Sequence, residues 1–270
     1  METKKKQKKS KKSSGISASI VILGCFIIAV CFFVFVCGDP ANFDEKGRPI
    51  AGNFFGTLHQ GGYIIPIVLT LMFTVICLSI ERFFAMSRAR GKGNLVKFVQ
   101  NVKVKLDEGD IDAARSLCDA QKGSVANILH AGLLRYEDVE KMANLSNDQK
   151  SQIIQSEIEE ATALELPTLQ QNLPVIATIS TLGTLFGLLG TVVGMIRSFG
   201  AMASEGSADS LALSLGISEA LLNTACGIAT GALAIISYNF FAQKVENITN
   251  AVDEIGFAVG QTYTQKHLND

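Results

Sequence analysis

One glutamate inside a long apolar stretch is the residue of this sequence best placed to do chemistry. Glu219 is the single formally charged side chain between Ser210 and Gln243, and Asn223 and Thr224 follow it four and five residues later. A charged side chain at the centre of a bilayer costs at least ~2.5 kcal/mol, so such residues usually mark ion or proton pathways. A carboxyl group with hydroxyl groups nearby can exchange protons while its polar atoms stay hydrogen-bonded. The pattern therefore indicates proton transfer inside a membrane.

The spacing of Thr191 and Glu219 predicts that they lie at the same depth. If the turn between their two apolar stretches is centred near Glu205, Thr191 lies fourteen residues before it and Glu219 fourteen residues after it. Both side chains then lie in the outer half of the membrane, with Thr224 about 7.5 Å deeper at the rise of a helix. We expect Glu219, Thr191 and Thr224 to form a proton pathway.

Alternatives stay open for each of these side chains. A protonated Glu219 that only hydrogen-bonds a neighbouring helix would explain the glutamate without transport. Asn223 fits either a hydrogen bond to Glu219 or a contact with a neighbouring helix or the pore. Thr191 and Thr224 are weak signals by themselves, because threonine often bonds the backbone of its own helix.

Glycines at helical spacing line both apolar stretches. Small residues at this spacing let helix backbones approach closely in lipid, and a glycine inside a helix is costly unless packing requires it. They are Gly183, Gly187, Gly190 and Gly194 in the first stretch and Gly227 and Gly231 in the second. Packing within one chain would explain them, but packing between identical subunits is favoured because four helices alone do not enclose a pore.

The composition points to a membrane protein. Of the 270 residues 48% are hydrophobic and 18% charged, against about 25% charged in soluble domains. Mean hydropathy is +0.29. Crossing the hydrocarbon takes about 20 mostly apolar residues. We therefore expect an all-α integral membrane protein with four transmembrane helices, an extra N-terminal helix before a three-helix core, at 16–37, 63–86, 173–198 and 213–241.

Basic residues beside the spans set the expected orientation. Lysine occupies seven of the first twelve positions, and Arg82, Arg88, Arg90, Lys92 and Lys97 cluster at the end of the second span. Because short basic flanks stay in the cytosol, both termini are predicted to be cytoplasmic. The expected segments between the spans are a basic tail 1–15, a periplasmic segment 38–62, a cytoplasmic helical segment 87–172, a periplasmic hairpin 199–212 and a cytoplasmic C-terminal helix 242–270.

Some segments outside the core permit more than one interpretation. The lysine tail is interpreted as an orientation signal, with contact to anionic lipid or a partner as the alternative. The first span resembles a signal peptide, but it is longer than usual and no clean cleavage site precedes Asp39, so a retained anchor is favoured. In the segment 87–172, Gly109 and Asp110 predict a turn and a helix cap, within long helices that extend from the membrane.

Several other classes of function find no support in the sequence. Residues 91–93, Gly-Lys-Gly, lack the preceding strand and the Ser or Thr of a phosphate loop. The six cysteines form no C-x-x-C pair and the three histidines lie far apart, so we expect no metal site and no cofactor. With no nucleophile and base pair, the chain is not expected to be an enzyme, and the lysine run does not indicate a nucleic-acid partner.

Three segments resemble the MotA/TolQ/ExbB proton channel family. GLLGTVVGMIRSF at 187–199 and GISEALLNTACGIATGALA at 216–234 look like its paired helices. GGYIIPIVLTLMFTVICLSIERFF at 61–84 resembles its first core helix with a Glu-Arg ending. The resemblance covers about 60–270. The chain departs from the family pattern in its extra N-terminal helix and in Leu185-Phe186, where Ala-Pro is common.

The resemblance implies a ring-forming subunit of the bacterial inner membrane, typically a homopentamer. Such a ring would surround the membrane helices of an ExbD/TolR-like dimer, with Thr191, Glu219 and Thr224 lining the channel, and membrane lipid outside. Proton-motive force would then drive a TonB/TolA-like protein. The glutamate of the E-A-L motif favours the ExbB/TolQ branch over flagellar stators. A membrane scaffold without proton conduction and a self-sufficient ion channel remain the alternative functions.

Overall fold

The computed structural model describes residues 17–266, apart from residues 46, 51, 143 and 206–209. The predicted basic tail 1–15 and the tip of the predicted hairpin lie outside these residues. Within them, every regular element is helical, and one residue pair, Phe43 and Pro49, forms an isolated β-bridge. The predicted all-α fold is confirmed.

The helices follow one another along the chain with short connections. In order they are α1 (Ala18–Cys31), which continues in a π-helical turn (Phe32–Cys37), a 3₁₀ turn (Pro40–Asn42), α2 (Phe54–Gln60), α3 (Ile64–Arg90), α4 (Leu95–Asp107), α5 (Ile111–Gln121), α6 (Ser124–Glu140), α7 (Asn147–Gln170), α8 (Leu173–Glu205) and α9 (Ser210–Lys266).

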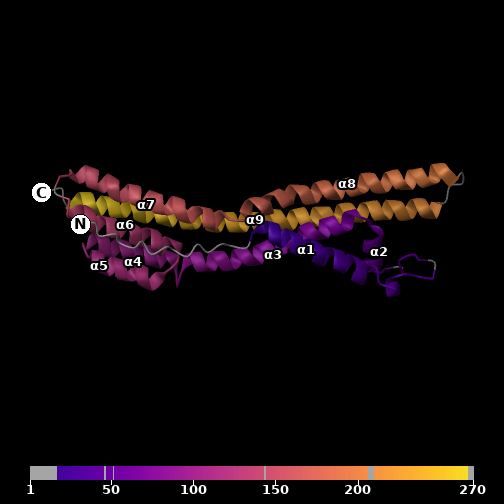
Figure 1. Cartoon of the computed structure of the whole chain (residues 1–270), viewed down its shortest axis with the longest axis horizontal. Helices are drawn as coiled ribbons and strands as arrows, with labels where there is room; N and C mark the ends of the chain where they lie inside the picture. Colours follow the sequence, from indigo (N-terminus) through magenta and orange to yellow (C-terminus); the bar gives the residue numbers. More distant parts are fainter. Residues whose placement is uncertain (1–16, 46, 51, 143, 206–209, 267–270) are drawn as a thin grey trace, which may run out of the picture.

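Helix α9 runs the length of this elongated molecule (Figure 1). Its 57 residues span about 85 Å at the rise of an α-helix. It pairs with α8 along one half and with α7 along the other, and α3 packs beside it. Helix α1 packs against α3 and thereby joins the half that contains α8.

Four helices are long and apolar enough to cross a membrane. They are α1 with its π-helical turn, α3, α8 and α9. The predicted spans 173–198 and 213–241 fall within α8 and α9, and the span 63–86 begins one residue before α3. Each of the three helices continues beyond the predicted span. Helix α8 extends to Glu205, so helix occupies part of the segment interpreted as the hairpin 199–212. The segment 242–266 continues the last span without a break, because no proline or turn sequence interrupts α9.

The half without α8 is a helical bundle of α4, α5, α6 and α7 with the C-terminal half of α9, called here the α4–α7 bundle. Its core contains fully buried side chains from all of these elements, among them Leu106, Ala114, Leu133, Ile154 and Val259. Asp110 accepts a hydrogen bond from the Ala113 amide at 2.9 Å, next to Gly109 with φ +74°. This geometry confirms the predicted turn and cap before α5.

Cys118 and Tyr136 are among the titratable side chains buried in the α4–α7 bundle. Burial raises the pKa of the Cys118 thiol to about 12, and the nearby Asp119 carboxylate adds to the effect. Burial likewise raises the pKa of Tyr136 to about 12, with further contributions from Glu140 and Tyr263. The Tyr136 and Tyr263 rings pack edge to face with centroids 4.9 Å apart. Both groups are therefore protonated at neutral pH.

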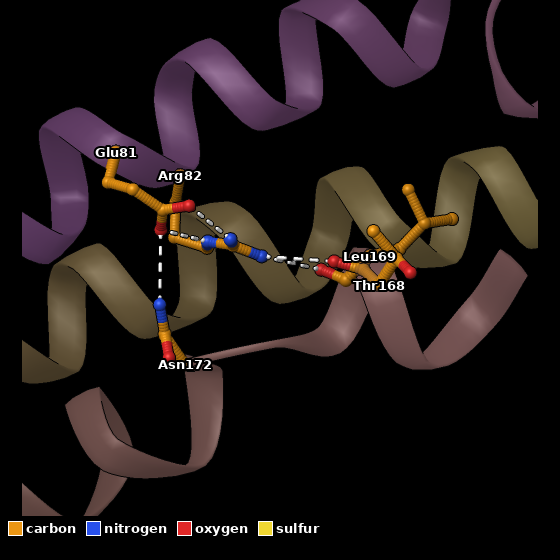
Figure 2. A network of polar contacts seen from close by, with 5 residues as sticks. All are labelled: Glu81, Arg82, Thr168, Leu169 and Asn172. Atoms are coloured by element: carbon orange, nitrogen blue, oxygen red, sulfur yellow. Dashed lines mark hydrogen bonds and ion pairs between the residues drawn. The ribbon is translucent and has the colours of Figure 1, made fainter. Parts of the chain in front are cut away.

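A buried arginine fixes the joint between α7 and α8 (Figure 2). Arg82 of α3 is 1% exposed and forms a two-pronged pair with Glu81, with Nε 2.6 Å from Oε2. Its Nη1 donates to the carbonyl oxygens of Thr168 and Leu169, at 3.2 and 3.4 Å. Asn172 donates to Glu81 Oε2 at 3.3 Å.

The position of this cluster explains why Arg82 is buried. The last carbonyls of a helix lack partners within the helix and attract a cation, and Thr168 and Leu169 belong to the last turn of α7. The chain then reverses through Asn172, whose φ is +64°, a conformation that asparagine adopts more readily than most residues. The Arg82 cluster therefore anchors the start of α8.

Candidate functional site

Helices α8 and α9 pack so closely that their facing glycines leave no room for a side chain. A Cβ on Gly227 would lie 2.6 Å from both the Gly183 carbonyl oxygen and the Gly187 Cα. A Cβ on Gly183 would lie 3.1 Å from the Gly231 amide nitrogen. Backbone atoms cannot yield as a flexible side chain can, so even alanine at Gly227 would push the two helices apart.

Gly190 and Gly194 of α8 accommodate side chains of α9. A Cβ on Gly190 would lie 2.5 Å from the Asn223 Cβ, and a Cβ on Gly194 would lie 2.9 Å from the Ala220 Cβ. All six predicted packing glycines thus face the partner helix within one chain. This geometry fits the alternative of packing within one chain, because two glycine rows of equal period face each other. Packing between identical subunits stays a prediction.

The facing pairs of the two helices are centred on position 207 of the sequence and not on Glu205. The facing pairs are Gly187 with Gly227, Gly194 with Ala220, and Ser198 with Gly216. A shift of two residues from the assumed centre at Glu205 moves the partner of Thr191 by four residues, about 6 Å along α9. The prediction that Thr191 and Glu219 lie level is therefore wrong. Thr191 is level with Asn223 and Thr224, because α8 remains helical further into the turn than assumed.

Thr191 and Thr224 meet directly across the hairpin. Their hydroxyl oxygens are in hydrogen-bond contact. Each hydroxyl also lies near the Gly187 carbonyl oxygen, Thr191 at 3.3 Å and Thr224 at 3.2 Å. Since a hydroxyl carries one proton, each threonine donates to one acceptor at a time: the partner hydroxyl, the Gly187 carbonyl or, for Thr191, the Ala220 carbonyl at 3.5 Å. The two can exchange donor and acceptor roles, which is the property that a proton relay requires.

Glu219 lies one turn nearer the end of the hairpin and on another side of α9. At about 100° per residue, Glu219 and Thr224 point about 140° apart. The Glu219 side chain is 22% exposed, and its Oε1 is 3.8 Å from Nη1 of Arg197. Both groups lie against Gly62, where a Cβ would be 3.3 Å from that Oε1 and 3.2 Å from that Nη1. The carboxylate is therefore directed at the junction of α2 and α3 and not at the threonine pair.

Asn223 forms a contact between helices. Its side chain is 2% exposed, and Nδ2 donates to the Gly61 carbonyl oxygen at 3.1 Å. Four residues apart on one helix, Asn223 and Glu219 lie on the same side of α9. The junction of α2 and α3 thus contacts both side chains, through Gly61 and Gly62.

A shallow, open hollow lies on the exposed face of α8 beside the threonine pair. It is lined by Thr191, Val192, Met195, Ile196 and Phe199. Apart from the Thr191 hydroxyl these side chains are apolar. The hollow therefore offers an apolar surface with one polar group that belongs to the candidate relay.

Comparison with known proteins identifies the family to which the residues of this site belong. A family model described as "MotA/TolQ/ExbB proton channel family" matches residues 121–254, about half of the chain. The matched range contains the threonine pair, Arg197 and Glu219, and it extends over α6, α7, α8 and most of α9. The chain belongs to this family. It is a membrane protein of the ExbB/TolQ branch.

Relatives of that branch match parts of the chain. The Tol-Pal system protein TolQ of Pseudomonas aeruginosa is 30% identical, over 45% of this chain and 53% of its own length. The biopolymer transport protein ExbB of Pseudomonas putida is 29% identical, over 48% of this chain and 41% of its own. TolQ of Haemophilus influenzae is 32% identical, over 33% and 41%. The chain thus spans about half or less of the length of these relatives.

Sequence reasoning missed two participants in the site. Arg197 is the single basic residue between 173 and 243, and its spacing from Glu219 was the signal that could have found it. Gly62 was assigned to the end of the periplasmic segment 38–62, and its contact with the ion pair depends on long-range packing that no local pattern reveals. We assign neither a metal nor a cofactor to these residues.

Proposed function

We propose that the chain is a ring subunit of an inner-membrane, proton-driven motor. The observation that carries this proposal is the contact of Thr191 with Thr224 over the Gly187 carbonyl, with Glu219 one helical turn away. Hydroxyl groups that share an acceptor can hand on a proton by exchanging donor and acceptor roles. A carboxylate in a membrane-spanning helix can load and release that proton.

In this proposal, protons pass between Glu219 and the threonine pair. The rise of a helix separates Glu219 from Thr224 by about 7.5 Å, which is too far for one direct transfer and requires an intermediate carrier. A carboxylate supplied by an ExbD/TolR-like partner helix, lying in the hollow beside Thr191, would serve as that carrier. The apolar lining of the hollow suits a membrane helix of this kind.

The exposed faces of α8 and α9 support a proposal for how the subunits assemble. Large apolar side chains on the free faces of α8 and α9 fit contact with lipid or with other subunits, among them Leu188, Leu189, Ile196, Leu221, Ile228 and Ile236. We propose a homopentamer around an ExbD/TolR-like dimer, with both chain termini in the cytoplasm. Its relatives bear the names Tol-Pal system protein and biopolymer transport protein. We therefore propose that the motor works on a TonB/TolA-like protein in outer-membrane transport or envelope maintenance, and that the chain is not an enzyme.

Replacement of the proposed pathway residues in living cells tests this function. Cells that depend on the chain would carry Glu219→Gln, Thr191→Val or wild type at equal membrane levels. Outer-membrane uptake and detergent resistance are then measured. Loss of both activities in the two variants is the expected result. Wild-type activity in both would refute the proposal.

The same variants separate the motor from the alternative functions. A scaffold without proton conduction would keep full activity with Glu219→Gln and would lose activity when Gly227 is replaced by a larger residue. A self-sufficient channel would conduct protons when the purified chain is placed in liposomes without any partner. The motor should require a co-purifying protein with a single membrane helix.

A further inference from the structure

Arg197 is the charged group nearest to Glu219, and the proposed proton pathway does not use it. The Arg197 Nη1 atom lies 3.8 Å from Glu219 Oε1. That separation exceeds hydrogen-bond length, so the two groups attract each other as ions without a fixed hydrogen bond between these atoms. Such a pair separates more readily than the two-pronged pair of Arg82 and Glu81.

The surrounding backbone leaves room for the guanidinium beside Glu219, and the Tyr63 ring contacts it. Gly62 adopts φ +66°, a conformation that favours glycine, and its missing side chain leaves room for both charged groups. The Arg197 guanidinium carbon lies 5.7 Å from the centre of the Tyr63 ring, within the range of a cation–π contact. The Arg197 side chain is 51% exposed, so it has free space to move away from Glu219 while it stays over the ring.

A carboxylate in a membrane helix needs a positive partner, and three candidates compete for it. A proton neutralises it, a metal cation such as Na⁺ binds it, or a fixed cation pairs with it. A tethered guanidinium is always present at the site and always charged. It therefore competes with dissolved Na⁺, whereas a proton abolishes the carboxylate charge on which both depend.

We propose that Arg197 is a positioning residue that acts as the built-in counter-cation of Glu219, and that it excludes metal cations from the carboxylate while permitting protonation. In one cycle a proton from water adds to Glu219 Oε1, and Arg197 keeps all of its protons. The charge of the pair changes from zero to +1, and the guanidinium moves away over Tyr63. When the proton leaves for the next acceptor, the ion pair forms again. This role deepens the proposed function, since it specifies which ion Glu219 exchanges.

Carbodiimide labelling of the full chain in liposomes tests the proposal. Dicyclohexylcarbodiimide attacks protonated carboxyl groups, and mass spectrometry measures the rate of modification at Glu219. The reaction is run at neutral pH in choline chloride and in NaCl of equal ionic strength. Wild type and Arg197→Lys should react slowly and equally in both salts. Arg197→Gln should react about tenfold faster in choline chloride, because an unpaired carboxyl in lipid takes up a proton, and NaCl should slow it.

Matched variants control the measurement. Glu219→Gln should abolish labelling at position 219, and Arg88→Gln, which removes an exposed arginine of α3, should behave as wild type. Wild-type labelling of Arg197→Gln in choline chloride would overturn the proposal. Slowing of wild-type labelling by NaCl would overturn it as well, even if Arg197→Gln does not fold.

The labelling experiment on Arg197 and the cell experiment on the motor can each succeed or fail without the other. If Glu219→Gln keeps full activity in cells while Arg197→Gln is labelled faster, the counter-cation role stands and the motor proposal fails. If Glu219→Gln abolishes activity while Arg197→Gln is labelled as wild type, the motor stands and the role of Arg197 fails.

Discussion

Thr191 on α8 and Thr224 on α9 share one acceptor, the carbonyl oxygen of Gly187. Each hydroxyl is also the other's hydrogen-bond partner. Gly187 and Thr191 lie one turn apart on α8, whereas Thr224 lies on α9, and close approach of the glycine faces brings Thr224 to the other two. The packing of the glycine faces therefore also forms the threonine contact. Substitutions that remove a hydroxyl and substitutions that push the helices apart should nevertheless have different effects.

Thr191→Val and Thr224→Val should each reduce proton flux by at least about tenfold, because a relay loses its function when one donor is removed. The volume of the side chain barely changes, so stability should fall by only about 1 kcal/mol. Flux is measured with a pH-sensitive dye in vesicles that contain the complex with its co-purified partner. Thr191→Ser keeps the hydroxyl and should retain most of the flux. Equal flux in Thr191→Val and Thr191→Ser would contradict the relay.

Gly227→Ala should destabilise the protein by roughly 1–3 kcal/mol, since its methyl group would lie 2.6 Å from backbone atoms of α8. Gly200→Ala is the matched control, because no atom of a neighbouring side chain or helix lies within 4 Å of a Cβ at that position. There the higher helix propensity of alanine should leave stability equal or raised by up to about 1 kcal/mol. Thermal unfolding in detergent, followed by circular dichroism, compares the two. Similar unfolding temperatures for both variants would argue against the close hairpin.

Arg82→Met should destabilise the protein by about 3–5 kcal/mol, because it leaves the Glu81 carboxylate without its cation and with only the Asn172 donor, and two α7 carbonyls without their donor. Arg88→Gln, one and a half turns further along α3, should change stability little. The double variant Glu81→Gln with Arg82→Met removes the orphaned charge as well, so it should be less destabilised than Arg82→Met alone. Chemical denaturation of the three purified variants measures these differences. An additive loss in the double variant would show that the pair is not coupled.

Stability should decline as pH rises above 9, in part through Cys118. The ordinary pKa of a thiol is 9.0, and burial raises that of Cys118 to about 12 in the folded protein. Between these values the unfolded chain loses a proton that the folded chain keeps, so the free energy of unfolding falls by up to about 1.4 kcal/mol per pH unit. Below pH 9 both states are protonated and the contribution is constant.

Cys118→Ala removes this titration and should show a shallower decline of the unfolding temperature between pH 9 and 10.5. The substitution also leaves a small cavity, which lowers stability equally at every pH. The slope is therefore the diagnostic quantity. An unchanged slope would mean that Cys118 ionises as readily in the folded chain as in the unfolded one.

Much of this fold could be predicted from the sequence, because the signals are local. Apolar stretches of spanning length located three of the long helices and the N-terminal one, and Asp110 after Gly109 located a helix start. The family resemblance rested on contiguous motifs around Thr191, Glu219 and Thr224. Each of these inferences depends on residues that are close together in the chain.

The parts that failed depend on register and on distant contacts. A two-residue error in the centre of the hairpin moved the partner of Thr191 by more than one helical turn, because the two antiparallel helices shift in opposite directions. The same cause hid the contact of Glu219 with Arg197. The packing of Gly62 against both groups joins residues that are more than 130 positions apart, and no periodicity of the sequence reports it.

The two long helices of the hairpin differ in how they leave it. Helix α9 passes from Ser210 to Lys266 as one unbroken rod, whereas α8 is connected to α7 through a bend at Asn172 held by Arg82. A displacement imposed near Glu219 would be carried along α9, which has no break. On the α8 side the helix is interrupted at Asn172, where hydrogen bonds from Arg82 and to Glu81 hold the bend. The candidate proton site is thus joined to the α4–α7 bundle by one continuous helix and by one bent, hydrogen-bonded connection.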